Sequence, residues 1–139
     1  METQPNKSVS YTGVVLDEKS RNELVAATEG IHGEWGWKTI CHHFTLNMGP
    51  LNRELNPDLE PGDVIDFKAT HLAFDDRVLA VRIACPGART VNAVPHVTVA
   101  LDSEGGAKAK YSNDLIEGMF MPLDREIDLR GVVTEVENT

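Results

Sequence analysis

The chain has 139 residues, of which 41% are apolar and 25% are charged, and its net charge at pH 7 is −9. This length and composition are typical of one globular domain. The acidic balance argues against a long nucleic-acid track, which needs clustered lysine and arginine. No apolar run approaches the length that spans a membrane, so we expect a cytoplasmic protein without a membrane partner.

The N-terminal part of the chain predicts a leader, a strand and a helix. Residues 1–9 are polar and are expected to form a flexible leader, with residues 10–139 as a single domain. A run rich in β-branched residues predicts a strand over 8–16, in which Gly13 indicates a bulge or the close approach of another group. Asp17 is a suitable N-cap for a helix that continues to about Thr28.

The rest of the chain is rich in predicted strands. Gly30 fits the end of the helix, and a loop with two tryptophans follows it. The remaining predicted elements, in chain order, are strands over 39–48, 64–74, 78–84 and 92–101, a short helix over 112–119 and a final strand over 126–136, in which Gly131 indicates a register break.

Two of these strands contain the same motif, histidine-x-threonine followed by an apolar residue. The first is His43-Phe44-Thr45-Leu46 and the second is His96-Val97-Thr98-Val99. Residues two apart in a strand point to the same face. Each motif therefore places an imidazole beside a hydroxyl. By the same alternation, Cys41 shares the face of His43, whereas His42 lies on the opposite face.

This pair of motifs suits the cleavage of a phosphodiester. The reaction needs a base that takes a proton from the attacking hydroxyl or water, and an acid that gives a proton to the leaving oxygen. Two histidines can divide these tasks, one neutral and one charged. Threonine hydroxyls can stabilise the negative charge that develops on the phosphoryl oxygens. No metal or other cofactor is needed.

The two motifs resemble the paired signatures of the 2H phosphoesterase superfamily, which includes the LigT-like RNA phosphodiesterases. The resemblance extends from Tyr11 to Leu101 and includes the proline before the second motif. The histidines are 53 positions apart, which is shorter than in most of that family, and this leaves no room for a helix before the second motif.

The resemblance implies a fold and the role of each motif residue. The expected fold is α+β, bilobal and pseudo-symmetric, with antiparallel or mixed sheets on either side of a central cleft and few helices. By analogy, His43 and His96 are the acid and base, and Thr45 and Thr98 bind the phosphate. The implied activity is that of a metal-independent phosphodiesterase. Its substrate would be a nucleotide or short oligonucleotide with a 2′,3′-cyclic phosphate, a 2′-5′ or 3′-5′ linkage, or a cyclic backbone. The alternative is a nucleotide-binding module without turnover.

Other residues are weaker candidates for the site. Tyr11, Trp35 and Trp37 can stack on a nucleobase, and Asn47 shares the predicted face of His43. The pair His42-His43 suggests zinc, but neighbours on a strand are poor co-ligands and the sequence has no paired Cys-x-x-Cys motif. The two cysteines, Cys41 and Cys85, are expected to be free thiols in a reducing compartment, with a disulfide between them as the alternative.

Overall fold

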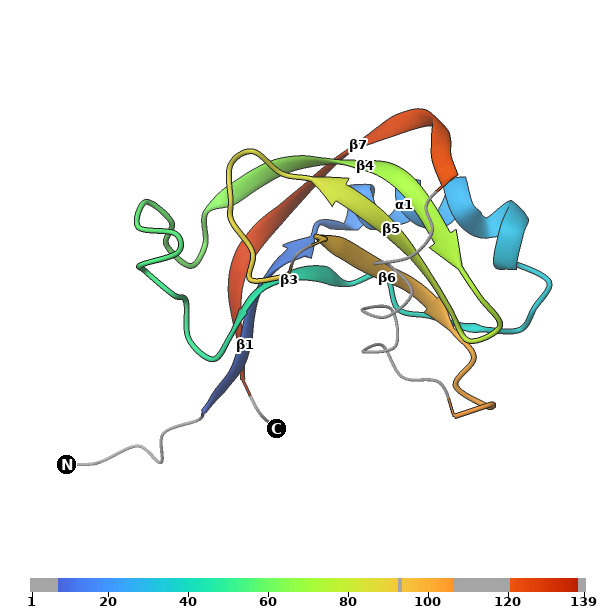
Figure 1. Cartoon of the computed structure of the whole chain (residues 1–139), viewed down its shortest axis with the longest axis horizontal. Coiled ribbons are helices and arrows are strands. Elements are labelled where there is room, and N and C mark those ends of the chain that lie inside the picture. The colour runs from blue at the N-terminus through green and yellow to red at the C-terminus, as the bar shows by residue number, and fades with distance from the viewer. Residues whose placement is uncertain (1–7, 93, 107–120, 138–139) are drawn as a thin grey trace.

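The computed structural model describes residues 8–92, 94–106 and 121–137, which form one helix and one seven-stranded sheet (Figure 1). All the strand pairs are antiparallel, and the strand order is β2-β6-β5-β4-β7-β1-β3. The bounds are β1 Val9–Leu16, α1 Glu18–His32, β2 Lys38–Thr39, β3 His43–Met48, β4 Val64–Phe74, β5 Val78–Ala84, β6 His96–Leu101 and β7 Met121–Glu137.

The sheet is continuous, so the expected division into two sheets is wrong. The reason is β7, whose 17 residues pair with β1 along one edge and with β4 along the other. This strand joins the half of the sheet that carries the first motif to the half that carries the second. The fold is a small α+β arrangement with few helices, as expected, but the structure does not confirm a bilobal, pseudo-symmetric form.

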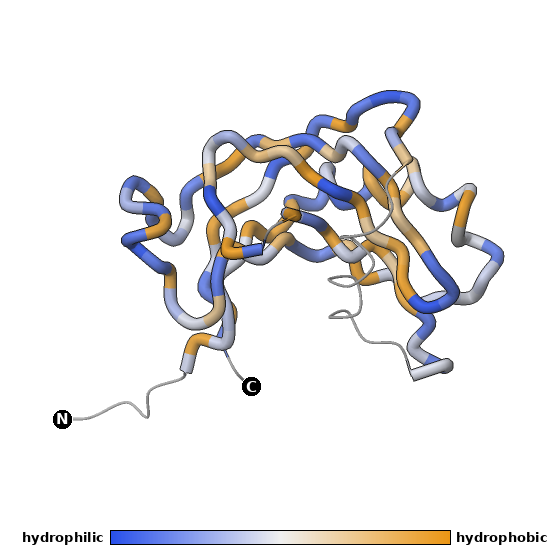
Figure 2. Tube along the Cα trace, in the orientation of Figure 1, coloured by the Kyte–Doolittle hydropathy of each residue, from blue (hydrophilic) through white to orange (hydrophobic). Residues whose placement is uncertain are grey.

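The sheet is strongly curled, and its concave side holds the core. Phe44 on β3 contacts Phe67 on β4, with ring centroids 4.8 Å apart, although two strands separate β3 from β4 in the sheet. Only curling can bring these rings together. Both belong to one buried cluster with side chains from β1, β5, β6 and β7. Figure 2 shows that apolar residues gather along the strands, whereas the connecting loops are mostly hydrophilic.

Helix α1 begins as the sequence predicts but ends later. The Asp17 side chain accepts a hydrogen bond from the Ser20 amide at 2.7 Å, which confirms the N-cap. The helix continues through Gly30 to His32 instead of ending near Thr28. Leu24 is fully buried in the core cluster and Ile31 packs against it. This apolar stripe extends the helix by one more turn, because Ile31 lies two turns after Leu24.

The chain crosses from one edge of the sheet to the other between β2 and β3. β2 pairs with β6 at one edge, and β3 pairs with β1 at the opposite edge. Cys41 lies between them with a φ of 42°, in the left-handed region that few non-glycine residues adopt. The single strand predicted over 39–48 is therefore wrong. The break turns the Cys41 side chain into the core, where it is fully buried.

The other predicted strands are all present, and β4 and β5 have the predicted bounds. The hairpin of β4 and β5 is confirmed, with the Asp75 carboxylate accepting bonds from the Arg77 and Val78 amides in the turn. β6 begins at His96, later than predicted, and β7 begins earlier than predicted. The predicted helix over 112–119 and most of the leader lie outside the described residues. No helix among the described residues is long and apolar enough to cross a membrane.

Gly131 allows a close approach between strands and does not break the register, which is continuous around it. A Cβ atom there would lie 2.6 Å from the Val15 carbonyl oxygen and 2.7 Å from a Val14 methyl group. Gly30 lies within helix α1, and a Cβ atom added there would have nothing within 4 Å.

We predict opposite effects of alanine at these two glycines. Gly131→Ala should destabilise the fold by about 1–3 kcal/mol, because backbone atoms must move to admit the methyl group. Gly30→Ala should stabilise it by about 0.5–1 kcal/mol, since alanine is the better helix former. Urea denaturation of the two variants measures both effects. Equal stability of the two variants would contradict this packing.

Candidate functional site

The four motif side chains lie on the convex face of the sheet. In β3, Phe44 and Leu46 point into the core, and in β6, Val97 and Val99 do so. Side chains alternate along a strand, so His43, Thr45, His96 and Thr98 point to the opposite face. His43 and the two threonines are partly buried.

Hydrogen bonds tie each motif strand to the segment that leads into the other one. Before β3, the Ile40 and Cys41 amides donate to the Val99 and Thr98 carbonyls at 2.8 and 3.0 Å. Beside β3, the Thr90 hydroxyl donates to the Thr45 carbonyl at 2.7 Å. The chain that leads into the second motif therefore runs against the first motif, and His43 begins its strand directly after this junction.

Tyr11 and Gly13 of β1 hold the ring of His43. The rings of Tyr11 and His43 are stacked, with centroids 4.6 Å apart and planes at 23°. A Cβ atom at Gly13 would lie 3.1 Å from Cδ2 of His43 and 2.8 Å from the Phe44 carbonyl oxygen. The register of β1 and β3 also shifts at Gly13. Both interpretations of this glycine, a bulge and a close approach, are confirmed.

The surroundings of His43 keep its imidazole neutral. Burial, followed by the nearby charges of His42 and His96, lowers the pKa of His43 from 6.5 to about 4. Removal from water penalises the charged form of the ring, and neighbouring cations add to that penalty. At neutral pH, His43 is therefore ready to accept a proton. The influence of His96 also shows that the two motif histidines lie within electrostatic range of each other.

His96 is fixed by its own backbone and is 8% exposed. Its Nδ1 lies 2.9 Å from the Val94 carbonyl oxygen. A carbonyl oxygen only accepts, so Nδ1 carries a proton. This arrangement orients the ring.

The sequence analysis misplaced His42. The imidazole Nδ1 atoms of His42 and His43 are 3.0 Å apart, and the ring planes meet at 78°. The prediction that the two rings lie on opposite faces is wrong, because residues 40–42 are not in a strand and the left-handed turn at Cys41 ends the alternation. The adjacent histidines were visible in the sequence, but the turn was not.

Arg82 is a further residue that the sequence analysis missed. It is exposed on β5, directly opposite His96 in the β5–β6 register. Directly opposed residues in an antiparallel pair share a face, with Cβ atoms about 5 Å apart. The side chain of an arginine thus starts beside the second motif histidine. Only the pairing register reveals it, and the sequence does not give that register.

The two tryptophans pack against each other. Trp35 contacts Trp37 and Phe74, with centroids 4.7 and 5.6 Å apart, and Trp37 packs against the core cluster. Phe74 lies two positions after the core residue Leu72, on the concave side of β4. Of the three predicted stacking residues, the structure brings only Tyr11 to a motif histidine.

Asn47 supports the loop after β3. It is 3% exposed, and its Nδ2 atom donates to the Met48 and Pro50 carbonyls at 2.8 and 2.7 Å. Its Oδ1 atom accepts from the Asn52 amide. These bonds engage both ends of the side-chain amide in the structure of the loop.

Neither cysteine is in a disulfide, since Cys41 and Cys85 are both free. In the described part of the chain, no group of three histidine, cysteine, aspartate or glutamate side chains is placed to hold a metal ion.

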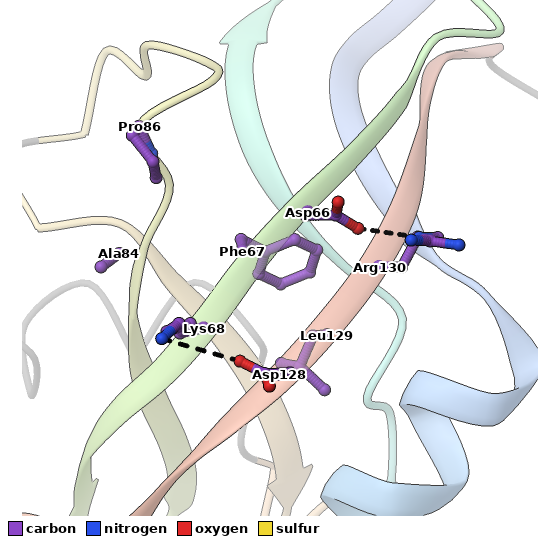
Figure 3. A pocket seen from close by; sticks show the side chains of 8 residues that line it. All are labelled: Asp66, Phe67, Lys68, Ala84, Pro86, Asp128, Leu129 and Arg130. Atoms are coloured by element: carbon purple, nitrogen blue, oxygen red, sulfur yellow. Dashed lines mark hydrogen bonds and ion pairs between the residues drawn. The ribbon is translucent and has the colours of Figure 1, made fainter.

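A cavity of about 530 Å³ is lined by residues of β4 and β7, together with Ala84 at the end of β5 and Pro86 after it. Figure 3 shows the charged side chains along its walls. Arg130 binds Asp66 at 2.8 Å, and Lys68 lies 3.8 Å from Asp128. Among the residues that line the cavity, each cation thus has a carboxylate partner. It is a poorer candidate for a phosphate than the convex face around the histidines.

A comparison with family models matches residues 26–135 to the fungal tRNA ligase phosphodiesterase domain. The chain belongs to this family. No curated protein and no solved structure matches it significantly. The family is part of the 2H phosphoesterase superfamily, so the resemblance seen in the two motifs is confirmed. Membership implies cyclic phosphodiesterase activity on RNA.

The low pKa of His43 predicts a specific dependence of stability on pH. The unfolded chain binds a proton at this ring near pH 6.5, whereas the folded chain binds it only near pH 4. The free energy of unfolding therefore falls as the pH drops through this window. A His43→Phe variant lacks this term, so from pH 7 to pH 5 the wild type should lose about 2 kcal/mol more than the variant. Denaturant titrations at both pH values measure the difference, and parallel pH curves for the two proteins would contradict it.

Proposed function

We propose that this chain is a metal-independent phosphodiesterase that opens a 2′,3′-cyclic phosphate on RNA, with His43 as the base and His96 as the acid. The observation that carries the proposal is the placement of both motif histidines on one face of the sheet, close enough for His96 to lower the pKa of His43. Family membership supports the reaction class.

The protonation of the two rings supports this division of roles. His43 is neutral at pH 7, so it can take a proton from water as the water attacks phosphorus. His96 enters the reaction protonated on both nitrogens, with Nδ1 held by Val94. As the bond between phosphorus and one ribose oxygen breaks, Nε2 of His96 gives its proton to that oxygen. The product is a phosphate monoester with a free hydroxyl beside it.

Neighbouring groups support the charge that develops on the phosphoryl group. Thr45 and Thr98 lie two residues from the histidines on the same face, where their hydroxyls can donate to phosphoryl oxygens. Arg82, beside His96, supplies positive charge on that face of a chain whose net charge is −9. This local cation favours a compact anionic substrate held at one point over a long nucleic-acid track. Tyr11 stacks on His43, and its role is to orient that ring.

Alanine at either histidine should abolish turnover and leave much of the binding. We expect His43→Ala and His96→Ala each to lower kcat by about 10²–10⁴-fold, because each removes one proton transfer. The assay uses 2′,3′-cyclic, 2′-5′-linked, 3′-5′-linked and cyclic oligonucleotide substrates in chelator, with products identified by mass.

Two outcomes would contradict the proposal. Binding of the oligonucleotides without turnover of any substrate by the wild type would identify a binding module. Strong inhibition by chelator that is reversed by zinc would identify a metal-dependent mechanism.

The pH profile should separate the two roles. If His43 is the base, its low pKa places the acidic limb of kcat/KM near pH 4, so activity should persist well below pH 6. The basic limb then reports the loss of the His96 proton. The residual activity of His43→Ala should lack the acidic limb. A wild-type acidic limb near the ordinary histidine pKa of about 6.5 would contradict the assignment.

A further inference from the structure

The imidazole of His42 contacts the Nδ1 atom of His43, the proposed base. Its Nδ1 lies 3.0 Å from Nδ1 of His43, which is within ordinary hydrogen-bond distance. His42 is exposed to solvent, whereas His43 is partly buried. Two imidazole nitrogens can form such a bond only if one carries the proton and the other accepts it. The contact therefore couples the tautomers of the two rings.

The geometry around His43 restricts which of its nitrogens can meet a substrate. Nδ1 faces His42 at 3.0 Å and the Tyr11 hydroxyl at 3.5 Å. Nε2 is thus the nitrogen left for a reacting proton. A base needs a lone pair at that atom, so in a competent His43 the proton is on Nδ1 and is donated to His42.

We propose that His42 is a positioning residue that holds His43 in the tautomer protonated at Nδ1. This inference rests on the proposed function, in which His43 is the base. In the arrangement that follows, Nδ1 of His42 accepts the bond, and its own proton is on Nε2, toward solvent. When His43 takes a proton at Nε2, the bond from its Nδ1 atom to His42 supports the new positive charge.

The other groups that face His43 do not replace this contact. The Tyr11 hydroxyl lies at the limit of hydrogen-bond distance, and its burial raises the pKa of the phenol, so it remains a neutral group. His96 influences His43 through its charge. Among the described residues, no carboxylate contributes to the low pKa of His43. A second imidazole therefore takes the place that an aspartate often has beside a catalytic histidine.

The contact also defines how the base returns to its starting state after turnover. The protonated His43 releases the proton on its Nε2 atom to water, while Nδ1 keeps its proton and the bond to Nδ1 of His42. One proton was taken up at Nε2 and one leaves from it, so neutral His43 returns in the form protonated at Nδ1.

Two substitutions at His42 distinguish this role from simple packing. Asn Oδ1 is as many bonds from the backbone as Nδ1 of histidine, so His42→Asn preserves an acceptor for the His43 proton. His42→Leu removes it. Met48→Ala, at the exposed end of the strand that follows His42, is the matched control. His42 is exposed, so we expect all three variants to fold, which circular dichroism and Tm will verify.

The decisive readout is the nitrogen NMR spectrum of ¹⁵N-histidine-labelled protein without substrate, which reports the tautomer of His43 directly. We expect the Nδ1–H form in the wild type and in His42→Asn, and a shift toward the Nε2–H form in His42→Leu. We also expect kcat to fall by about 10–100-fold in His42→Leu, the range typical of residues that orient a reacting ligand, with most of the loss recovered in His42→Asn.

Other outcomes would overturn the inference. These are an Nε2–H tautomer in the wild type, an unchanged tautomer in His42→Leu, or equal losses of activity in the Leu and Asn variants. The tautomer is measured without turnover, so these results are distinct from a failure of the proposed function, which would appear as a wild-type protein without phosphodiesterase activity.

Discussion

The structure depends on one short crossing of the chain, residues 40–42, which connects the two opposite edges of the curled sheet. The amides of Ile40 and Cys41 bond to β6, and the next residue, His42, accepts a bond from Leu16 of β1. The left-handed backbone of Cys41 makes this change of partner, and its buried side chain anchors it in the core. The crossing thus hydrogen-bonds the segment just before the first motif strand to the second motif strand, although four strands separate the two in the order of the sheet. Both histidines lie on the convex face.

The crossing also sets the electrostatics of the site. It brings three imidazoles, those of His42, His43 and His96, to one place, and Tyr11 covers the ring of His43. Holding that ring out of water costs stability in acid, because the folded state resists protonation there. The same penalty keeps the ring neutral at pH 7, as a base requires. Stability and the proposed chemistry are therefore linked through one pKa.

The sequence predicted the elements that follow from local rules. Asp17 as the helix cap, the turn at Asp75 and the two motif strands depend on residues close together in the chain. The predictions that failed depend on distant contacts. The length of β7 joins what looked like two sheets, and the turn at Cys41 brings His42 onto the site. Arg82 was missed because its relation to His96 exists only in the strand register. The two motifs nonetheless identified the superfamily, since the chemistry needs those residue types at that spacing.

A crystal structure with a bound nucleoside 2′- or 3′-monophosphate, the product class of the proposed reaction, tests the central claim most directly. The account predicts one phosphate on the convex face, with Nε2 of His43 and Nε2 of His96 each within about 3.2 Å of a phosphate oxygen. It also predicts that the hydroxyls of Thr45 and Thr98 donate to the same group. A phosphate bound elsewhere, or contacted by only one of the two imidazoles, would contradict it.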